Sequence, residues 1–396
     1  MEPTAAAVAP AARAPPPAPP KPGRLTSLDI FRGATIALMI LANCHGADGK
    51  ANNLGPLQHG GWHQMTLTDW IFPFFIFIMG VAMPFSFSRR LAEPNGKLRL
   101  HLQLVRRCLL LFLLGWLIHL SPQFAWKELR ILGVPPRLGL CYLFAGLIAL
   151  HFGRRMRLAL IPLLLLGYWA LMVYVPFPGK TDDPWARGGR NAPENLTQYI
   201  DQKVLGVHLE SPYDMESKGI LSTVPAITNA LVGFLCGVWL RSSRSPLELS
   251  NGLFVGGTLF VVAGLIWHDL GVPFNQGLWT PSFAALTCGL AMLALAACYW
   301  RIDISGRSLF NSFFLVFGAN SLFAFMGHQV LRKYLDIPKV FELAGQAVPF
   351  RTFVYSKYLA PWAGPLGGSL LYALVNVAFW WTLCWILWRR RIFIKV

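Results

Sequence analysis

The chain has 396 residues, of which 55% are hydrophobic and 13% are charged. Soluble globular domains carry about 25% charged residues, so this composition excludes an ordinary soluble domain and indicates an integral membrane protein. The formal net charge of +17 lies largely in short loops between apolar segments, which favours a role in membrane orientation over nucleic-acid binding. We therefore expect the lipid bilayer as a partner and no nucleic acid.

Residues 1 to 23 precede the first apolar segment and read MEPTAAAVAPAARAPPPAPPKPG. This Pro/Ala-rich stretch lacks the apolar core of a signal peptide, and it predicts a disordered cytoplasmic tail. The rest of the chain, from 24 to 396, is expected to form a single transmembrane domain.

Long apolar segments recur along the rest of the chain, and a helix needs about 20 such residues to cross the hydrocarbon core. The strands of a transmembrane β-barrel alternate polar and apolar residues, and these segments do not show that alternation. The sequence therefore predicts an all-α polytopic membrane protein, a bundle of about ten transmembrane helices. The segments are 30 to 45, 70 to 88, 103 to 120, 138 to 151, 157 to 175, 221 to 240, 252 to 268, 279 to 300, 309 to 331 and 366 to 388.

Short loops rich in Lys and Arg alternate with longer, less basic ones, and the basic loops of a membrane protein face the cytoplasm. This pattern predicts that both termini are cytoplasmic. Residues 46 to 69 and the long loop 176 to 220 then face the periplasm of a bacterium. The long loop holds seven of the 18 acidic residues. It is either a solvated connection or a cover for a polar or cationic molecule.

Ionisable side chains near lipid are costly unless they are paired or line a wet cavity, so they point to function. Asp29 and Arg32 stand three residues apart on one helical face and can form an ion pair; Arg32 can instead reach an anionic ligand. Arg130 and Arg137 flank a glycine and two prolines before the fourth span. They are either interfacial anchors or a phosphate-binding entrance.

The stretch QHGGWHQMTLTD, 58 to 69, places two histidines directly before an apolar run. Its two glycines let backbone approach a ligand, Trp62 offers an apolar face, and Asp69 can orient an imidazole. His59 and His63 have an HxxxH spacing but lack a third ligand at a familiar distance, so no metal is expected. They are either polar interfacial residues or part of a catalytic site.

Two further groups of polar residues lie in or beside apolar spans. Asn43 and His45 end the first span, and Asn320, Ser321 and His328 lie in FGANSLFAFMGHQVL, 317 to 331. Such side chains either hydrogen-bond across helices or line an interior cavity. Cavity lining is the favoured role for Asn320 and His328.

Several motifs in one order resemble the heparan-α-glucosaminide N-acetyltransferase family of membrane enzymes, and most closely its bacterial members of the NagX type. The likeness runs from about Arg24 to the last residue. The motifs are RLTSLDIFRGATIALMILAN, QHGGWHQMTLTDWIFPFFIFIMG, RILGVPPRLGLCYL, LWTPSF and FGANSLFAFMGHQVL.

This resemblance implies acetyl transfer from cytoplasmic acetyl-CoA to the amine of a glucosamine unit across the bacterial inner membrane. The family's essential histidine corresponds to His59, its helix-ending asparagine to Asn43 and its helix-opening aspartate to Asp69. Its Gly-x-Asn-Ser element falls on Gly318, Asn320 and Ser321, and His328 follows at the matching place. Because only the Pro/Ala tail precedes this region, a free amino sugar is the expected acceptor.

An amine that attacks a thioester needs a base with a pKa near 7 and donors for the developing oxyanion. We expect His59, held by Asp69, to be this base, with Asn43 or Asn320 as donor. Alternatively, His59 carries the acetyl group transiently. The other expected contacts are with the sugar (Trp62, His63, Asn320 and His328) and with the CoA phosphates (Arg32, Arg130 and Arg137).

Two other functions fit the composition. An amino-sugar transporter of the inner membrane is one, although the sequence lacks the internal repeat that many transporters show. An O-acyltransferase acting on envelope polysaccharide is the other, and it would use His59 as well. A homodimer is compatible with the sequence, which does not fix the oligomeric state.

Overall fold

A computed structural model describes residues 25–44, 57–188, 193–210, 216–307, 311–337, 340–343 and 345–394. The predicted tail and His45 lie outside these described residues. The helices of the bundle are α1 (Thr26–Asn43), α2 (Leu67–Leu91), α3 (Gly96–Leu120), α4 (Val134–His151), α5 (Arg154–Tyr174), α7 (Thr223–Leu240), α8 (Pro246–Asp269), α9 (Pro281–Tyr299), α10 (Asn311–Ala319), α11 (Ser321–Asp336) and α13 (Ala360–Arg389).

Short elements occupy the connections between these helices. Single turns of 3-10 helix lie at Trp126–Glu128 and Gly206–His208, and π-helical turns lie at Trp300–Ile304 and Tyr355–Leu359. The remaining elements are α6 (Leu196–Leu205), α12 (Phe350–Val354) and the antiparallel strands β1 (Phe341–Leu343) and β2 (Gln346–Val348), in which Phe341 faces Val348.

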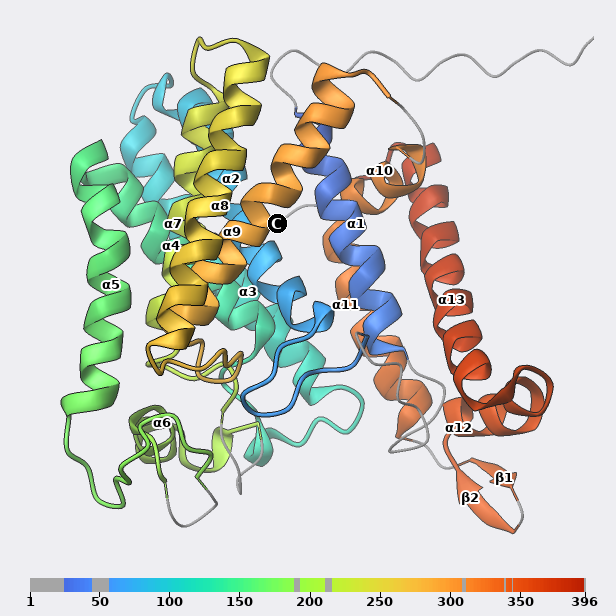
Figure 1. Cartoon of the computed structure of the whole chain (residues 1–396). Coiled ribbons are helices and arrows are strands. Elements are labelled where there is room, and N and C mark those ends of the chain that lie inside the picture. Colours follow the sequence, from blue (N-terminus) through green and yellow to red (C-terminus); the bar gives the residue numbers. More distant parts are fainter. Residues whose placement is uncertain are drawn as a thin grey trace, which may run out of the picture.

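The structure confirms the predicted all-α membrane fold. Eight of the described helices are long and apolar enough to cross a membrane, and a ninth span results if α10 and α11, which meet at a bend of 75°, are counted together as one. The ten predicted segments are these nine together with α1, which has 18 residues and runs beside them (Figure 1). The bend within α10–α11 is the main departure, because the sequence predicts one continuous span over 309 to 331.

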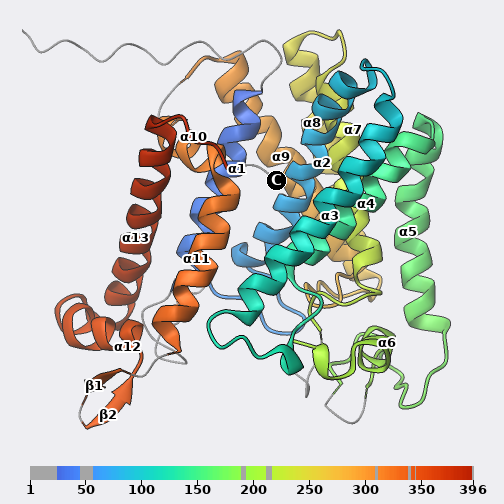
Figure 2. The same ribbon diagram turned by 180° about the vertical axis from the view of Figure 1, so that it is seen from behind.

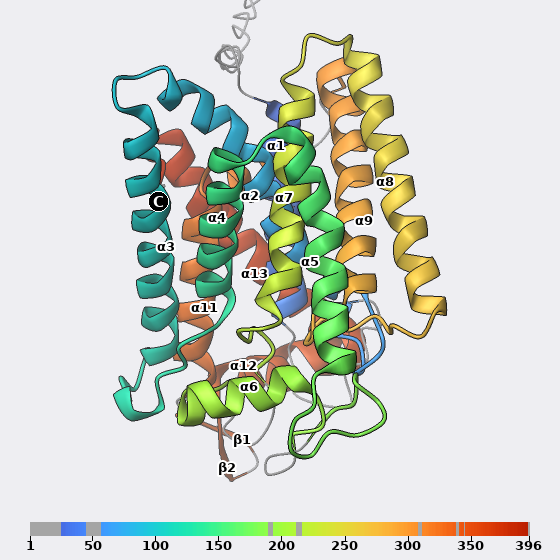
Figure 3. The same cartoon turned by 90° about the vertical axis from the view of Figure 1, so that its left-hand side faces the viewer.

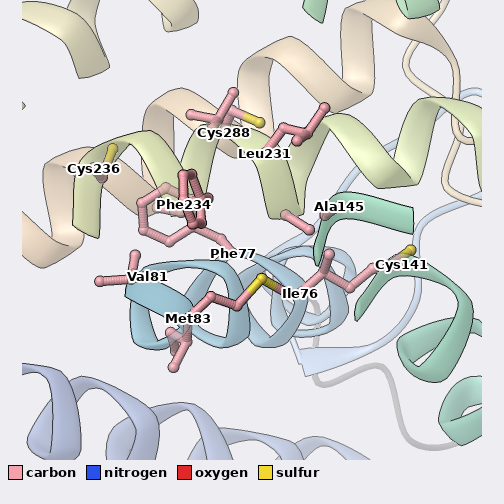
Figure 4. Close-up of a cluster of buried hydrophobic side chains, with 14 of the residues drawn as sticks. Ile76, Phe77, Val81, Met83, Cys141, Ala145, Leu231, Phe234, Cys236 and Cys288 are labelled. Carbon is pink, nitrogen blue, oxygen red and sulfur yellow. The ribbon is translucent and has the colours of Figure 1, made fainter. Parts of the chain in front are cut away.

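The larger group of helices, α2 to α5 and α7 to α9, shares one apolar core. Figure 4 shows Phe77 of α2 close to Phe234 of α7 in this core. The two helices approach closely at glycines: a Cβ on Gly80 would meet the carbonyl of Ala230, and a Cβ on Gly233 would meet that of Phe77. Small residues at such contacts let membrane helices gain backbone packing.

The smaller group consists of α1, α10, α11 and α13, whose core includes Ile40, Phe317 and Trp380. Here too two helices meet at glycines. A Cβ on Gly33 of α1 would meet the backbone of α10, and one on Gly318 of α10 would meet the carbonyl of Asp29.

Two ends of the bundle can be distinguished. α1 begins and α13 ends at the upper end of Figure 1, which we call the far end. The loop at 57 to 66, α6, α12 and the β1–β2 hairpin lie at the other end, which we call the site end, and Figure 3 shows α6 lying across it. This grouping of loops is the one that the charge pattern predicts.

α11 joins the two groups of helices at the site end, where Figure 2 shows it near α3. Lys333 Nζ donates to the carbonyls of Ile118, at 2.7 Å, and His119, at 3.1 Å. Arg332 Nη1 donates to the carbonyl of Asn43 at 3.2 Å. Both cations therefore lie at the carboxyl ends of helices, where the helix dipole favours positive charge.

Candidate active site

A cavity of about 400 Å³ opens at the site end between α2, α3, the start of α4 and α11. We call it the site cavity. Its apolar lining includes Met39, Phe75 and Phe325. Its polar lining consists of Asn43, His59, Thr68, His119, Arg130, Glu210, Lys218, Gln276, Gln329, Arg332 and Lys333.

His59 and Asp69 form a hydrogen-bonded pair at this cavity. Nδ1 of His59 lies 2.6 Å from Oδ1 of Asp69. The imidazole is 59% exposed, whereas the carboxylate is only 3% exposed. A carboxylate accepts and cannot donate, so the proton of the ring is assigned to Nδ1 and the lone pair to Nε2. The ring therefore presents a base on the nitrogen that Asp69 does not hold.

The local sequence explains why Asp69 is fixed. It is the third residue of α2, and its Oδ2 accepts from the backbone N–H of Thr66 at 2.9 Å and of Gly60 at 3.1 Å. The Thr66 hydroxyl donates to the carbonyl of Gln58. This capping box folds the loop back onto the helix start and satisfies N–H groups that lack helical partners. The Asp69 carboxylate thus binds the backbone of the loop and also orients the imidazole of His59.

Asn43 and Gln276 lie at the same cavity as His59. Asn43 is the last residue of α1, its carbonyl accepts from Arg332, and the residue lines the cavity. Gln276 Nε2 lies 3.5 Å from the carbonyl of Asp69. Of the predicted trio, His59 and Asn43 therefore line one cavity, and Asp69 adjoins it through its bond to His59.

Trp62 and His63 are not part of the cavity lining. Trp62 Nε1 donates to the carbonyl of Trp185 at 2.8 Å, and the carbonyl of Trp62 accepts from Asn275 Nδ2 at 2.6 Å. His63 is exposed beside it, and partial burial lowers its pKa despite the opposing charge of Asp183. Trp62 thus ties the His59 loop to two other loops of the site end.

Arg130 lines the cavity from a network of charges. Its guanidinium binds the carboxylates of Glu216, with Nε to Oε2 at 3.0 Å, and of Glu210, with Nη2 to Oε2 at 2.9 Å. Burial lowers the pKa of Arg130, but the hydrogen bonds and charges of the two glutamates outweigh it and raise that pKa. Burial lowers the pKa of the neighbouring Lys218 to about 8, although Glu210 opposes this.

The other two predicted arginines lie elsewhere. Arg137 is fully buried in α4, where it donates to the carbonyl of Gly219 at 3.2 Å and to the hydroxyl of Ser222. Its guanidinium carbon stacks 5.2 Å from the ring centre of Trp279. Arg32 lies near the start of α1 and pairs with Asp29 at 3.1 Å. Arg32 and Arg130 therefore lie at opposite ends of the bundle.

Asn320 and His328 are both buried, at 0% and 1% exposure, and neither lines the site cavity. Asn320 stands at the break between α10 and α11 and bonds to backbone at 392 to 394. His328 Nδ1 lies 3.7 Å from Sγ of Cys44. Within the described part of the chain its Nε2 has no hydrogen-bond partner. It lines a small pocket that shares Asn43 and Arg332 with the site cavity.

Sequence reasoning misses Gln276, Gln329, Arg332 and Lys333, which all line the cavity. The last two directly follow FGANSLFAFMGHQVL and lie about one helical turn after His328, so this spacing was the available signal. Among the described residues, no group of three His, Cys, Asp or Glu side chains is placed to hold a metal ion.

The fold and the cavity define a polytopic helical membrane protein with a histidine–carboxylate pair at one end of its bundle. The family model described as "Heparan-alpha-glucosaminide N-acetyltransferase, catalytic" matches residues 24 to 254. The chain belongs to this family.

Two relatives carry the name heparan-alpha-glucosaminide N-acetyltransferase. The Homo sapiens protein is 27% identical over 427 residues, which cover 95% of this chain and 60% of the relative. The Mus musculus protein is 25% identical over 425 residues, which cover 94% of this chain and 60% of the relative. The chain therefore spans about 60% of the length of the curated relatives it matches.

Proposed function

We propose that this protein transfers the acetyl group of acetyl-CoA to the amine of glucosamine or a related amino sugar, with His59 as the base. The observation that carries the proposal is the bond between Asp69 and His59, a residue that lines the same cavity as Asn43. The family, and the names of the two relatives, support the reaction class and the sugar.

In the proposed reaction one proton moves from the amine to His59 and then to the leaving thiolate. The neutral amine nitrogen attacks the thioester carbonyl carbon, and Nε2 of His59 takes the proton that this nitrogen loses. The Asn43 side-chain amide donates to the oxyanion of the tetrahedral intermediate. The C–S bond then breaks, and the imidazolium returns the proton to the leaving thiolate. Asp69 stabilises the imidazolium and keeps Nε2 directed away from itself.

A relay through an acetylated His59 uses the same nitrogen as nucleophile. Direct transfer and the relay differ in whether an acetylated protein forms when no amino sugar is present. Mixing the protein with acetyl-CoA alone and analysing it by mass spectrometry separates them, because only the relay leaves an acetyl group on the peptide that contains His59.

In the proposed orientation the site end faces the periplasm of a bacterial inner membrane, and acetyl-CoA approaches from the far end. Of the three arginines assigned to CoA, Arg32 then lies at the donor's end. Arg130 lies with His59 at the acceptor's end. We accordingly assign the CoA phosphates to the neighbourhood of Arg32, and we assign Trp62 the role of positioning the His59 loop.

The test uses the purified protein in nanodiscs with acetyl-CoA and glucosamine, and it follows thiol release. We expect His59→Ala to lower the rate by about 10² to 10⁴-fold, the contribution of a general base. His63→Ala is the matched control, since it removes an exposed imidazole four residues away that does not line the cavity. Equal rates in the two variants would remove His59 from the mechanism.

The acceptor separates the proposal from the other two functions. N-acetylglucosamine has the hydroxyls of glucosamine but no free amine, so an N-acetyltransferase will not turn it over, whereas an O-acyltransferase will. Uptake of labelled glucosamine into proteoliposomes without acetylation would instead identify a transporter.

A further inference from the structure

The segment after α13 turns back onto the bundle. Arg391 adopts a left-handed conformation with φ of 58°, its N–H donates to the carbonyl of Trp388 at 3.0 Å, and the N–H of Ile392 donates to that of Leu387 at 2.9 Å. These two bonds form the helix-ending motif in which glycine is usual, so arginine adopts this conformation at a steric cost. The reversal directs residues 392 to 394 toward the α10–α11 junction.

Asn320 holds this segment through its backbone. Asn320 Nδ2 donates to the carbonyl of Ile392 at 3.1 Å, and Asn320 Oδ1 accepts from the N–H of Ile394 at 3.0 Å. Ile392, Phe393 and Ile394 are 45%, 43% and 41% exposed, although Asn320 is fully buried. Each of these three side chains therefore keeps close to half of its surface exposed.

The junction lies between the far end and the site cavity. Two residues before Asn320, the carbonyl of Gly318 lies 3.5 Å from Nη1 of Arg32. Five residues after Asn320, Phe325 lines the site cavity, and five residues of helix span about 7.5 Å. Arg32, Asn320 and Phe325 thus follow one another from the proposed donor end toward the space that His59 faces.

This order matches the order of groups in an acyl-CoA, which has phosphates at one end, a thioester at the other and a chain with two amides between them. The Asn320 side chain uses an N–H donor and its carbonyl acceptor on two consecutive amides of the segment, and the two neighbouring amides of the chain offer the same pair of groups. A buried asparagine that lost both bonds would be strongly penalised. Whatever replaces the segment must therefore offer Asn320 a carbonyl and an N–H.

We propose that Asn320 binds the two amides of the pantetheine arm of the acyl-CoA donor, the carbonyl of one and the N–H of the other, and that residues 392 to 394 occupy this site until the donor displaces them. This inference rests on the proposed function, because it takes the acyl-CoA donor from it. The opposing view is that the segment is a permanent part of the fold, and the two views predict opposite effects of loosening it.

Ile394→Pro removes the N–H that Asn320 accepts, and Ile394→Ala removes the side chain but keeps that N–H. We expect Ile394→Pro to bind CoA about fivefold more tightly than the wild type, the equivalent of one hydrogen bond, while Ile394→Ala stays within about twofold. In an Asn320→Ala background, Ile394→Pro will have no effect on the Kd, since the contact that it loosens is already absent. Calorimetry of full-length protein in nanodiscs gives these Kd values without turnover.

Hydrogen exchange provides a second readout in the unmodified protein. The N–H of Ile394 donates to Asn320 Oδ1 in this structure, so we expect addition of CoA to accelerate its exchange. Slower or unchanged exchange, or a Kd that Ile394→Pro weakens or leaves unchanged, will overturn the inference while the proposed donor stands. If the wild type does not bind CoA at all, the proposed function falls together with it.

Discussion

The exposed imidazole of His59 is held by the nearly buried carboxylate of Asp69, with 2.6 Å between Nδ1 and Oδ1. A hydrogen bond to a carboxylate fixes the tautomer of a histidine and stabilises its charged form. The capping box around Thr66 in turn fixes the carboxylate. The base is therefore oriented by a hydrogen-bonded helix start, even though its own ring is exposed.

Asp69→Asn tests this orientation. An amide nitrogen facing Nδ1 favours the tautomer with the proton on Nε2, which has no lone pair to offer the amine. We expect kcat for acetyl transfer to fall by about 10³ to 10⁴-fold, measured by thiol release, with a smaller change in KM.

The matched control for the capping role is Thr66→Ala, which removes the hydroxyl of the box and leaves the His59–Asp69 bond. Loss of such a side chain costs about 1 kcal/mol of stability. A similar loss of kcat in both variants would show that the loop's position, and not the tautomer, limits the rate.

The core of the candidate site is predictable from the sequence for a local reason. His59 and Asp69 are ten residues apart, and the helix-start pattern between them brings them together. Asn43 requires the resemblance, because nothing local ties the end of α1 to the start of α2. The role of Trp62 is not predictable, since its partners Trp185 and Asn275 lie in distant loops.

The fold follows from hydropathy wherever a span is continuous. Hydropathy does not distinguish a straight span from a bent one, so the 75° junction at Asn320 is visible only in the structure. The bonds from Asn320 to Ile392 and Ile394 also escape prediction, because they join segments more than 70 residues apart through backbone atoms. Arg137 is ambiguous from sequence because its buried partners, at Gly219 and Ser222, lie 82 and 85 residues away.

The network around Arg130 predicts unequal roles for its two glutamates. Glu216 is fully buried and also accepts from the N–H groups of Glu210, at 2.9 Å, and Lys218, at 3.0 Å. Glu216→Gln leaves the buried guanidinium of Arg130 without its closest negative charge, so we expect the free energy of unfolding to fall by about 3 kcal/mol. Glu210 is 43% exposed, and Glu210→Gln will cost less than about 1 kcal/mol. Thermal unfolding in detergent measures the stability of both variants, and equal shifts of the unfolding temperature would contradict the unequal roles of the two glutamates.

Asp201 of α6 predicts a pH dependence of stability. Burial raises its pKa to about 7, aided by Glu216, while the N–H of Ile220 and the charge of Arg137 oppose the shift. The pKa of Asp201 in the folded protein exceeds the unfolded value of about 3.9. Between these two pKa values the carboxyl is protonated in the folded protein but ionised in the unfolded chain, so the free energy of unfolding falls as the pH rises from about 4 to 7.

Asp201→Asn removes this loss because an amide stays neutral at every pH. We expect the variant to be more stable than the wild type at pH 8 by at least about 1 kcal/mol and to match it near pH 4. Asp182→Asn, which changes an exposed carboxylate at the same end of the bundle, is the control and will not alter the pH dependence. Parallel melting curves for Asp201→Asn and the wild type from pH 4 to 8 would refute the prediction.

The close contact of α2 with α7 predicts that the site depends on glycines far from it. Gly80→Ala places a Cβ against the carbonyl of Ala230, whereas Gly167→Ala in α5 meets nothing within 4 Å. Overpacking costs about 1 to 3 kcal/mol, while alanine in an open helical position gains about 1 kcal/mol. Gly80→Ala will therefore lower the unfolding temperature and Gly167→Ala will raise it. Because α2 also carries Asp69, a displaced α2 moves the base. We therefore expect Gly80→Ala to lose acetyl transfer even below its unfolding temperature. Full activity at such a temperature would mean that α2 and α7 separate without disturbing the start of α2.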